Sequence, residues 1–216
     1  MNVTNNYKII HFLMTIRNVS KIQIKSCIDI NRKYKRININ QSFYGNFLML
    51  NKEILFLYGE VNDTIADTII KNIIYLNNTT TTKNLTLMIN SPGGSVTSGL
   101  AMYDSFNLVD MHIGTTCIAL AASMGAFLLG SGYKGKRNGF NHCRIMIHQP
   151  LGGIVGSFNQ IESQANELLY YKLVLNSYIS NFSSQAPVKV MRDCDRDYFM
   201  SSREAAKYGI IDNVLK

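Results

Sequence analysis

The stretch "EILFLYGEVNDTIADTIIKNIIYLNNTTTTKNLTLMIN" (residues 53–90) decides the fold. Its first seven residues form a short apolar run that ends in glycine, which predicts a buried strand. Over residues 62–78, isoleucine or leucine recurs at positions 65, 69, 73 and 76, the spacing of one helix face, and Asn62, Asp63 or Thr64 can cap that helix. Residues 85–90 form the next strand, so the stretch predicts a strand–helix–strand unit.

The same alternation continues along the chain. "SPGG" (91–94) turns into a helix over residues 96–109, residues 112–120 form a strand, and a short apolar helix runs from Ser123 to Gly130. Near the C-terminus, "SSRE" (201–204) matches a capping box and Gly209 closes that helix. Repeated strand–helix units with apolar strands predict an α/β fold in which helices cover a mostly parallel sheet.

The positive charge of the chain is concentrated at its N-terminus. Residues 1–36 contain eight Lys and Arg against the single acid Asp29, whereas residues 37–216 contain 14 bases and 13 acids. A basic nucleic-acid groove on the body is therefore disfavoured. We divide the chain into a basic N-terminal extension (1–36) and a folded domain (37–216). The composition of the extension is typical of an organelle transit segment, of a native arm, or of compositional drift.

Cysteine usage and hydropathy narrow the class of protein further. The four cysteines (Cys27, Cys117, Cys143 and Cys194) are widely spaced, which favours free thiols in a reducing compartment over a zinc site. No run approaches the roughly 20 apolar residues of a membrane span.

One long element does not fit a compact monomer. Apolar residues keep helical spacing over residues 158–182, and a helix of that length measures about 37 Å. Because a domain of this size has a radius of gyration of about 16 Å, the helix is predicted to protrude. Its apolar stripe predicts an oligomer built through residues 151–183. A kinked helix packed wholly on its own domain is the alternative.

The apolar stretch "LAASMGAF" (120–127) contains one serine, Ser123, where a strand meets a helix. The free N–H groups of a first helical turn, among them that of Met124, favour negative charge there, so a nucleophile at this position would have an oxyanion donor beside it. Serine is also an ordinary N-cap, and position alone favours that interpretation. Ala121 replaces the first glycine of the hydrolase elbow G-x-S-x-G, so that motif does not decide between them.

A base and an acid must come from elsewhere in the chain. His148 follows the apolar run "CRIMI", at the end of a strand where parallel sheets present active-site groups. An orienting acid can come from "RDCDRD" (192–197), but no spacing rule selects among Asp193, Asp195 and Asp197. The glycines of "SPGG" leave the amide of Gly94 free to face a ligand, or serve only a tight turn.

Four longer segments together carry a resemblance. They are "INSPGGSVTSGLAMYDS" (89–105), "CIALAASMGAFLLGSGYKGKR" (117–137), "RIMIHQPLGG" (144–153) and "RDCDRDYFMSSREAAKYGIIDNVL" (192–215). In this order and at these separations, they closely resemble the proteolytic subunits of the Clp protease family. The likeness runs from about Phe43 to the C-terminus.

The resemblance implies a crotonase-like α/β fold with a protruding handle helix, and serine endopeptidase activity on unfolded polypeptides. It implies that Ser123 is the nucleophile, His148 the base and Asp197 the acid. It further implies that the amides of Gly94 and Met124 form the oxyanion hole. Asp195 and Arg196 resemble a pair that, where two rings of subunits stack, contacts the opposite ring.

The resemblance also implies the assembly: two stacked seven-membered rings of this chain or its paralogues, fed by an ATP-driven unfoldase. No cofactor is expected on this chain, which has no Gly-rich phosphate loop, and the partner uses the ATP. Thr86 and Met88 stand where the family commonly has aromatics that help hold the unfoldase, and His142 is an extra histidine without a role.

Two other functions remain open beside the peptidase. One is a structural subunit of a mixed ring, and the other is acyl-CoA chemistry on the related crotonase scaffold. The basic extension favours a plastid, with the mitochondrial matrix and the bacterial cytoplasm as alternatives.

Overall fold

The computed structural model describes residues 53–153 and 155–216. The predicted basic extension (1–36) and the first part of the predicted domain lie outside the described residues. The strands are β1 (Ile54–Tyr58), β2 (Asn84–Ser91), β3 (His112–Ala122), β4 (Arg137–Phe140), β5 (Arg144–Ile147), β6 (Tyr198–Ser201) and β7 (Asn213–Leu215). The helices are α4 (Asp63–Thr79), α5 (Val96–Leu108), α6 (Met124–Gly130), α7 (Phe158–Ser183), α8 (Pro187–Asp193) and α9 (Ser202–Tyr208).

The first strand–helix–strand unit forms as the sequence predicts. Asn62 is the N-cap of α4, and its side chain accepts the Ile65 N–H at 3.0 Å. The apolar face of α4 is buried through Ile69, Ile73 and Leu76. Strands β1 and β2 then pair in parallel, with Phe56 opposite Met88. This unit confirms the α/β fold class at the start of the described region.

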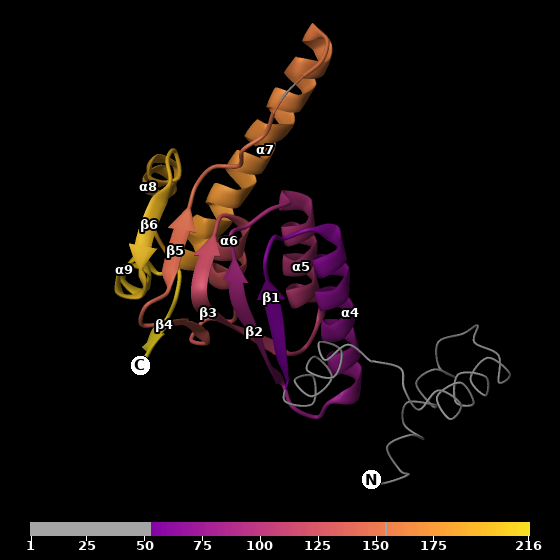
Figure 1. Ribbon diagram of the computed structural model, residues 1–216, viewed down its shortest axis with the longest axis vertical. Helices are drawn as coiled ribbons and strands as arrows, with labels where there is room; N and C mark the ends of the chain where they lie inside the picture. Colours follow the sequence, from indigo (N-terminus) through magenta and orange to yellow (C-terminus); the bar gives the residue numbers. More distant parts are fainter. Residues whose placement is uncertain (1–52, 154) are drawn as a thin grey trace, which may run out of the picture. The chain divides into compact units, whose positions relative to one another are not determined.

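In the described residues, seven strands form one sheet. The path β1-β2-β3-β4-β7 is parallel throughout, and β5 branches from it by pairing with the end of β3. Strand β6 joins β5 in the only antiparallel pairing among these strands. Because β2, β3 and β5 are parallel, their carboxyl ends meet at one edge of the sheet, as Figure 1 shows. The residues that follow these three strands therefore come together.

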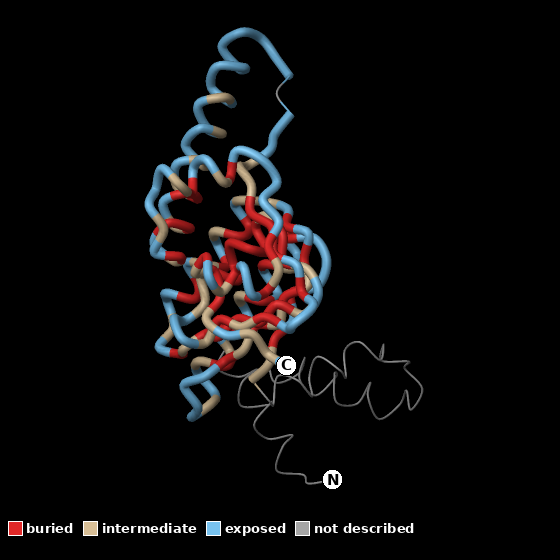
Figure 2. Tube along the Cα trace, turned by 90° about the vertical axis from the view of Figure 1, so that its left-hand side faces the viewer, coloured by how far each residue is buried: buried red, intermediate tan, exposed pale blue. Residues whose placement is uncertain are grey.

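Helix α7 extends well beyond the sheet (Figure 1). Its buried residues all lie in the second half, from Leu175 to Ser183. The first half is mostly exposed, as the pale blue segment in Figure 2 shows, and it presents apolar side chains such as Phe158, Ile161 and Leu169. The prediction of a protruding handle helix is confirmed, and no kink folds it back onto the domain.

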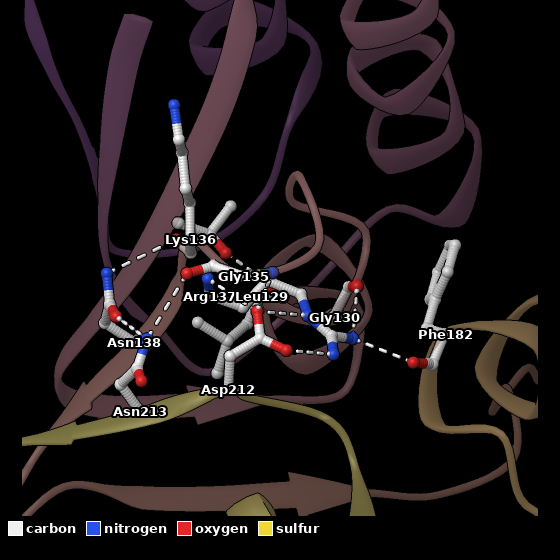
Figure 3. Close-up of polar contacts among 10 residues, drawn as sticks. Leu129, Gly130, Gly135, Lys136, Arg137, Asn138, Phe182, Asp212 and Asn213 are labelled. Carbon is white, nitrogen blue, oxygen red and sulfur yellow. Dashed lines mark hydrogen bonds and ion pairs between the residues drawn. The ribbon is translucent and has the colours of Figure 1, made fainter.

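A buried ion pair joins the ends of several elements (Figure 3). Arg137 donates to both carboxylate oxygens of Asp212, at 2.6 and 3.0 Å, and its side chain is 4% exposed. The same guanidinium donates to the carbonyls of Gly130 and Phe182, near the C-terminal ends of α6 and α7. Asp212 also accepts the backbone N–H of Gly135. The pair therefore fixes the base of α7 to the sheet and to α6.

Other parts of the chain were not anticipated in detail. Strands β4, β6 and β7 and helix α8 were not predicted as separate elements.

At the C-terminus, the predicted capping box is present: Ser201 accepts the Glu204 N–H, and Gly209 ends α9 with a φ of 98°. The described cysteines, Cys117, Cys143 and Cys194, are free and buried. No helix in the described residues is both long and apolar enough to cross a membrane.

Candidate active site

Ser123 stands between β3 and α6 in a conformation that few residues other than glycine adopt. Its φ is 53° and its ψ is −122°, and its N–H donates to the carbonyl of Met146 at 2.9 Å. Although Ser123 occupies the N-cap position of α6, its side chain makes no capping hydrogen bond. Its Oγ lies instead 2.9 Å from Nε2 of His148. The hydroxyl therefore faces a base, and the capping interpretation is wrong for this side chain.

His148 directly follows β5, and Asp197 directly precedes β6. In the antiparallel β5–β6 pair, Ile147 lies opposite Tyr198, so the two flanking residues are neighbours. His148 Nδ1 lies 3.0 Å from Oδ1 of Asp197. Strand pairing thus brings together a hydroxyl, an imidazole and a carboxylate from residues 123, 148 and 197, in the relay order that nucleophilic catalysis requires.

The base and the acid of this relay differ in exposure. The His148 side chain is 14% exposed, whereas that of Asp197 is 61% exposed. Water therefore reaches the carboxylate and screens its charge, so the pairing with the imidazole is weaker than in a fully buried triad. The carboxylate therefore orients the ring and adds a charge that water partly screens.

The three aspartates of "RDCDRD" have separate partners. Asp193 accepts from Lys189 and Tyr208; burial would raise the pKa of Asp193, but those hydrogen bonds outweigh it and lower the pKa. Asp195 accepts from Lys172 of α7 at 3.0 Å. Of the three, Asp197 is the one that meets His148. The structure thereby distinguishes the acids that sequence spacing could not.

The "SPGG" loop packs directly against Ser123. A methyl group on Gly93 would lie 2.6 Å from Cβ of Ser123 and 3.1 Å from the Met124 nitrogen, so only glycine fits. The loop is held by Val61, whose N–H donates to Gly93 O at 2.7 Å and whose carbonyl accepts the Ser95 N–H at 2.8 Å. Gly93 and Gly94 have φ values of 101° and 142°.

The amides of Gly94 and Met124 are available for a ligand. Within residues 53–153 and 155–216, neither amide donates a hydrogen bond. Met124 is the first residue of α6, where the helix dipole favours negative charge. Two free backbone donors beside a serine hydroxyl are the arrangement that stabilises an oxyanion.

An apolar pocket opens beside Ser123 and His148. It is lined by Val96, Met124, Phe127, Ile147, Leu175 and Ile179. Leu175 and Ile179 belong to α7, whose apolar stripe predicted an oligomer contact or packing on its own domain, but no place beside the site. Its apolar stripe was the available signal, but spacing alone does not indicate which half of the stripe faces the site.

The positions that depart from the family pattern lie on the outer face of the sheet. Thr86 and Met88 are half-buried on β2. Phe56 and Tyr58, on the neighbouring strand β1, are 39% and 51% exposed, and their ring centroids are 6.0 Å apart. Because Phe56 is opposite Met88 in a parallel pair, their side chains share this face. Aromatic surface is therefore present here on β1.

The comparisons with known proteins point to one family. The family model described as Clp protease matches residues 35–216. The ATP-dependent Clp protease proteolytic subunit of Borreliella afzelii (strain PKo) is 48% identical over 167 residues, which are 77% of this chain and 85% of the relative. ATP-dependent Clp protease proteolytic subunit 1 of Borreliella burgdorferi is 47% identical over 167 residues, covering 77% of this chain and 86% of the relative.

Proposed function

The chain belongs to the Clp protease family, and on this premise we propose that Ser123, His148 and Asp197 are its nucleophile, base and orienting acid. The chain is a serine endopeptidase of ATP-dependent proteolysis. The observation that carries the residue assignment is the 2.9 Å contact of Ser123 Oγ with His148 Nε2, made where a capping hydrogen bond would be expected.

The proposed mechanism uses only groups of this chain. His148 accepts the proton as Ser123 Oγ attacks the carbonyl carbon of a peptide bond, and Asp197 holds the ring in the required tautomer. The amides of Gly94 and Met124 donate to the oxyanion. His148 then gives the proton to the leaving amine, and the C–N bond breaks. Water, deprotonated by the same imidazole, then attacks the acyl-enzyme carbonyl; the bond to Ser123 Oγ breaks, the acid product leaves, and His148 returns the proton to Ser123 Oγ.

Substitution of the nucleophile tests this assignment. Ser123→Ala should lower turnover of a fluorogenic peptide by several powers of ten and abolish labelling by a fluorophosphonate probe. Ser105→Ala is a control, because it also removes a serine hydroxyl, one that is buried and donates to the Met102 carbonyl within α5. Normal turnover by the Ser123→Ala chain would eliminate the proposal.

The proposed substrate is an unfolded polypeptide that is cut within a closed ring chamber. Oligomeric assembly with Clp ATPases follows from the family, and we propose two stacked seven-membered rings as its form. The exposed apolar half of α7 supports a role of residues 151–183 in ring contacts. Asp195 and Arg196, which are exposed and resemble a pair that contacts the opposite ring, support the stacking of two rings. Native mass spectrometry should show fourteen subunits; a stable monomer or a single ring would contradict this.

The partner is proposed to be an ATP-driven unfoldase, with no cofactor on this chain itself. Phe56 and Tyr58 offer an exposed aromatic surface for it beside Thr86 and Met88. Replacement of both aromatics by serine should lower ATP-dependent protein degradation while leaving hydrolysis of short peptides unchanged. Equal loss of both activities would place the effect in folding or assembly.

A second candidate is a structural subunit of a mixed ring, which the small side chain of Thr86 on the outer face favours. Fluorophosphonate labelling of assembled rings separates the two, since a structural subunit would remain unlabelled.

The proposed location is a plastid-type organelle. The basic residues of 1–36 support a transit segment, and the family match begins only at residue 35. The two relatives named above are bacterial, so the bacterial cytoplasm is the alternative. The intact mass of the native chain decides whether the extension is removed.

A further inference from the structure

The end of strand β2 departs from regular pairing directly before the "SPGG" loop. Ile89 pairs with Cys117, but Ser91 pairs with Ala121, so β3 contains extra residues at this point. The side chain of Asn90 compensates, since its Oδ1 accepts the Leu120 N–H at 3.3 Å. Bulges of this kind redirect side chains near active sites. Here the bulge sets where Ser91 meets the end of β3.

Ser91 is a polar residue at an apolar position. Strand alternation places it on the same face as the buried residues Leu85, Leu87 and Ile89, and it is 1% exposed. Its Oγ accepts the N–H of Gly93 at 3.1 Å within the protein interior. A buried hydroxyl in this place fixes the first glycine of the loop, because the Gly93 N–H would otherwise be buried without an acceptor.

The same residue also touches the first turn of α6. A methyl group on Gly125 would lie 3.0 Å from the Ser91 carbonyl oxygen and 3.2 Å from its Cβ. Ser91 is therefore in contact with the residue after Met124 and is hydrogen-bonded to the residue before Gly94. It lies between the two segments that carry the proposed oxyanion donors.

We infer that Ser91 is a positioning residue that sets the spacing of the Gly94 and Met124 amides; this inference rests on the proposed function of the site. The two donors come from different elements, a loop and a helix, and an oxyanion needs both within hydrogen-bonding distance at once. Ser91 binds the loop through its hydroxyl and packs on the helix through its backbone. It contacts no reacting atom.

The test is Ser91→Ala, compared with Ser105→Ala, which removes an equally buried hydroxyl from α5. Complete removal of one oxyanion donor costs about 10²- to 10³-fold in kcat. Because Ser91→Ala displaces a donor without removing it, we expect kcat for a fluorogenic peptide to fall about tenfold with KM unchanged. Affinity for a peptide boronate, which places an oxygen at the oxyanion position, should fall by the same factor. Binding of a product peptide should not change.

Each outcome decides the inference. Unchanged kcat and boronate affinity in Ser91→Ala would overturn it, as would a fall that Ser105→Ala reproduces or a rise in KM alone. If Ser91→Ala does not assemble, Ser91→Cys takes its place, because a thiol has a similar volume but is a weak acceptor. The wild-type chain and Ser123→Ala are measured in parallel. Loss of the difference between those two would instead refute the proposed function.

Discussion

Replacement of Asp197 by Asn tests how much an exposed acid contributes to the relay. The Asp197 carboxylate lies 3.0 Å from His148 Nδ1 but is 61% exposed, whereas the imidazole is 14% exposed. Unit charges about 4 Å apart interact by about 1 kcal/mol in water and about 4 kcal/mol at the effective dielectric of a protein surface. Given this exposure, about 2 kcal/mol is a reasonable value, which corresponds to about 30-fold in rate.

The expected loss in kcat is therefore about 10²-fold once the loss of ring orientation is added, compared with about 10⁴-fold when a buried triad acid becomes Asn. Asp197→Ala should lose a similar amount, because water can reach Nδ1 in place of the carboxylate. Initial rates with a fluorogenic peptide over a range of concentrations measure kcat and KM separately.

The control is Asp67→Asn, which removes an exposed carboxylate that pairs with Lys71 on α4. It should change kcat by less than about twofold. A loss near 10⁴-fold for Asp197→Asn would refute the argument from exposure. A loss below about threefold would show that Asp197 does not orient His148.

Three further outcomes are expected. Arg137→Met leaves the Asp212 carboxylate without its partner, so it should destabilise the fold by about 3 kcal/mol and lower Tm by about 6–12 °C. The control Lys71→Met, which breaks an exposed pair, should shift Tm by less than about 2 °C. Equal shifts in the two variants would contradict this. Burial would raise the pKa of Asp212, but the hydrogen bonds from Arg137 outweigh it and lower the pKa. The ion pair therefore stabilises the fold fully above about pH 4, and this stabilisation is lost as pH falls through the lowered pKa. Urea unfolding from pH 5 to pH 2 should show a steeper loss of stability for wild type than for Asp212→Asn. Gly93→Ala places a methyl group 2.6 Å from Cβ of Ser123, so kcat should fall at least about 10²-fold while the rings still assemble, and a chain of normal activity would contradict the close packing.

Much of the fold was predictable because its signals are local. The spacing of Ile69, Ile73 and Leu76 predicted α4, and "SSRE" with Gly209 predicted α9 at both ends. Strands β4, β6 and β7 were missed since each has only three or four residues and acquires its identity from pairing. Arg137 shows the reason: its charge is buried only because Asp212, far along the chain, meets it.

The active-site arrangement divides in the same way. Position on strand ends indicated Ser123 and His148, but the local pattern favoured an N-cap for Ser123 and a structural role for a lone histidine such as His148. The choice among Asp193, Asp195 and Asp197 depends on the β5–β6 register, which no local pattern encodes. Only the resemblance to the Clp protease family indicated Asp197 as the acid, because spacing could not. The positioning role inferred for Ser91 could not be predicted from the sequence. Ser91 is the first residue of the "SPGG" turn motif, and its contact with Gly125 arises only when the chain folds.

The unusual backbone of Ser123 has a consequence for the choice of inactive variants. A non-glycine residue with a φ of 53° and a ψ of −122° costs about 1–3 kcal/mol, which alanine retains and glycine relieves. Ser123→Gly should therefore melt higher than Ser123→Ala although both lack the nucleophile. The difference between these two inactive variants measures the backbone strain at position 123, less the extra conformational entropy that glycine loses on folding. A trap for bound substrate is accordingly better made with alanine, since it keeps the resting strain of the working enzyme.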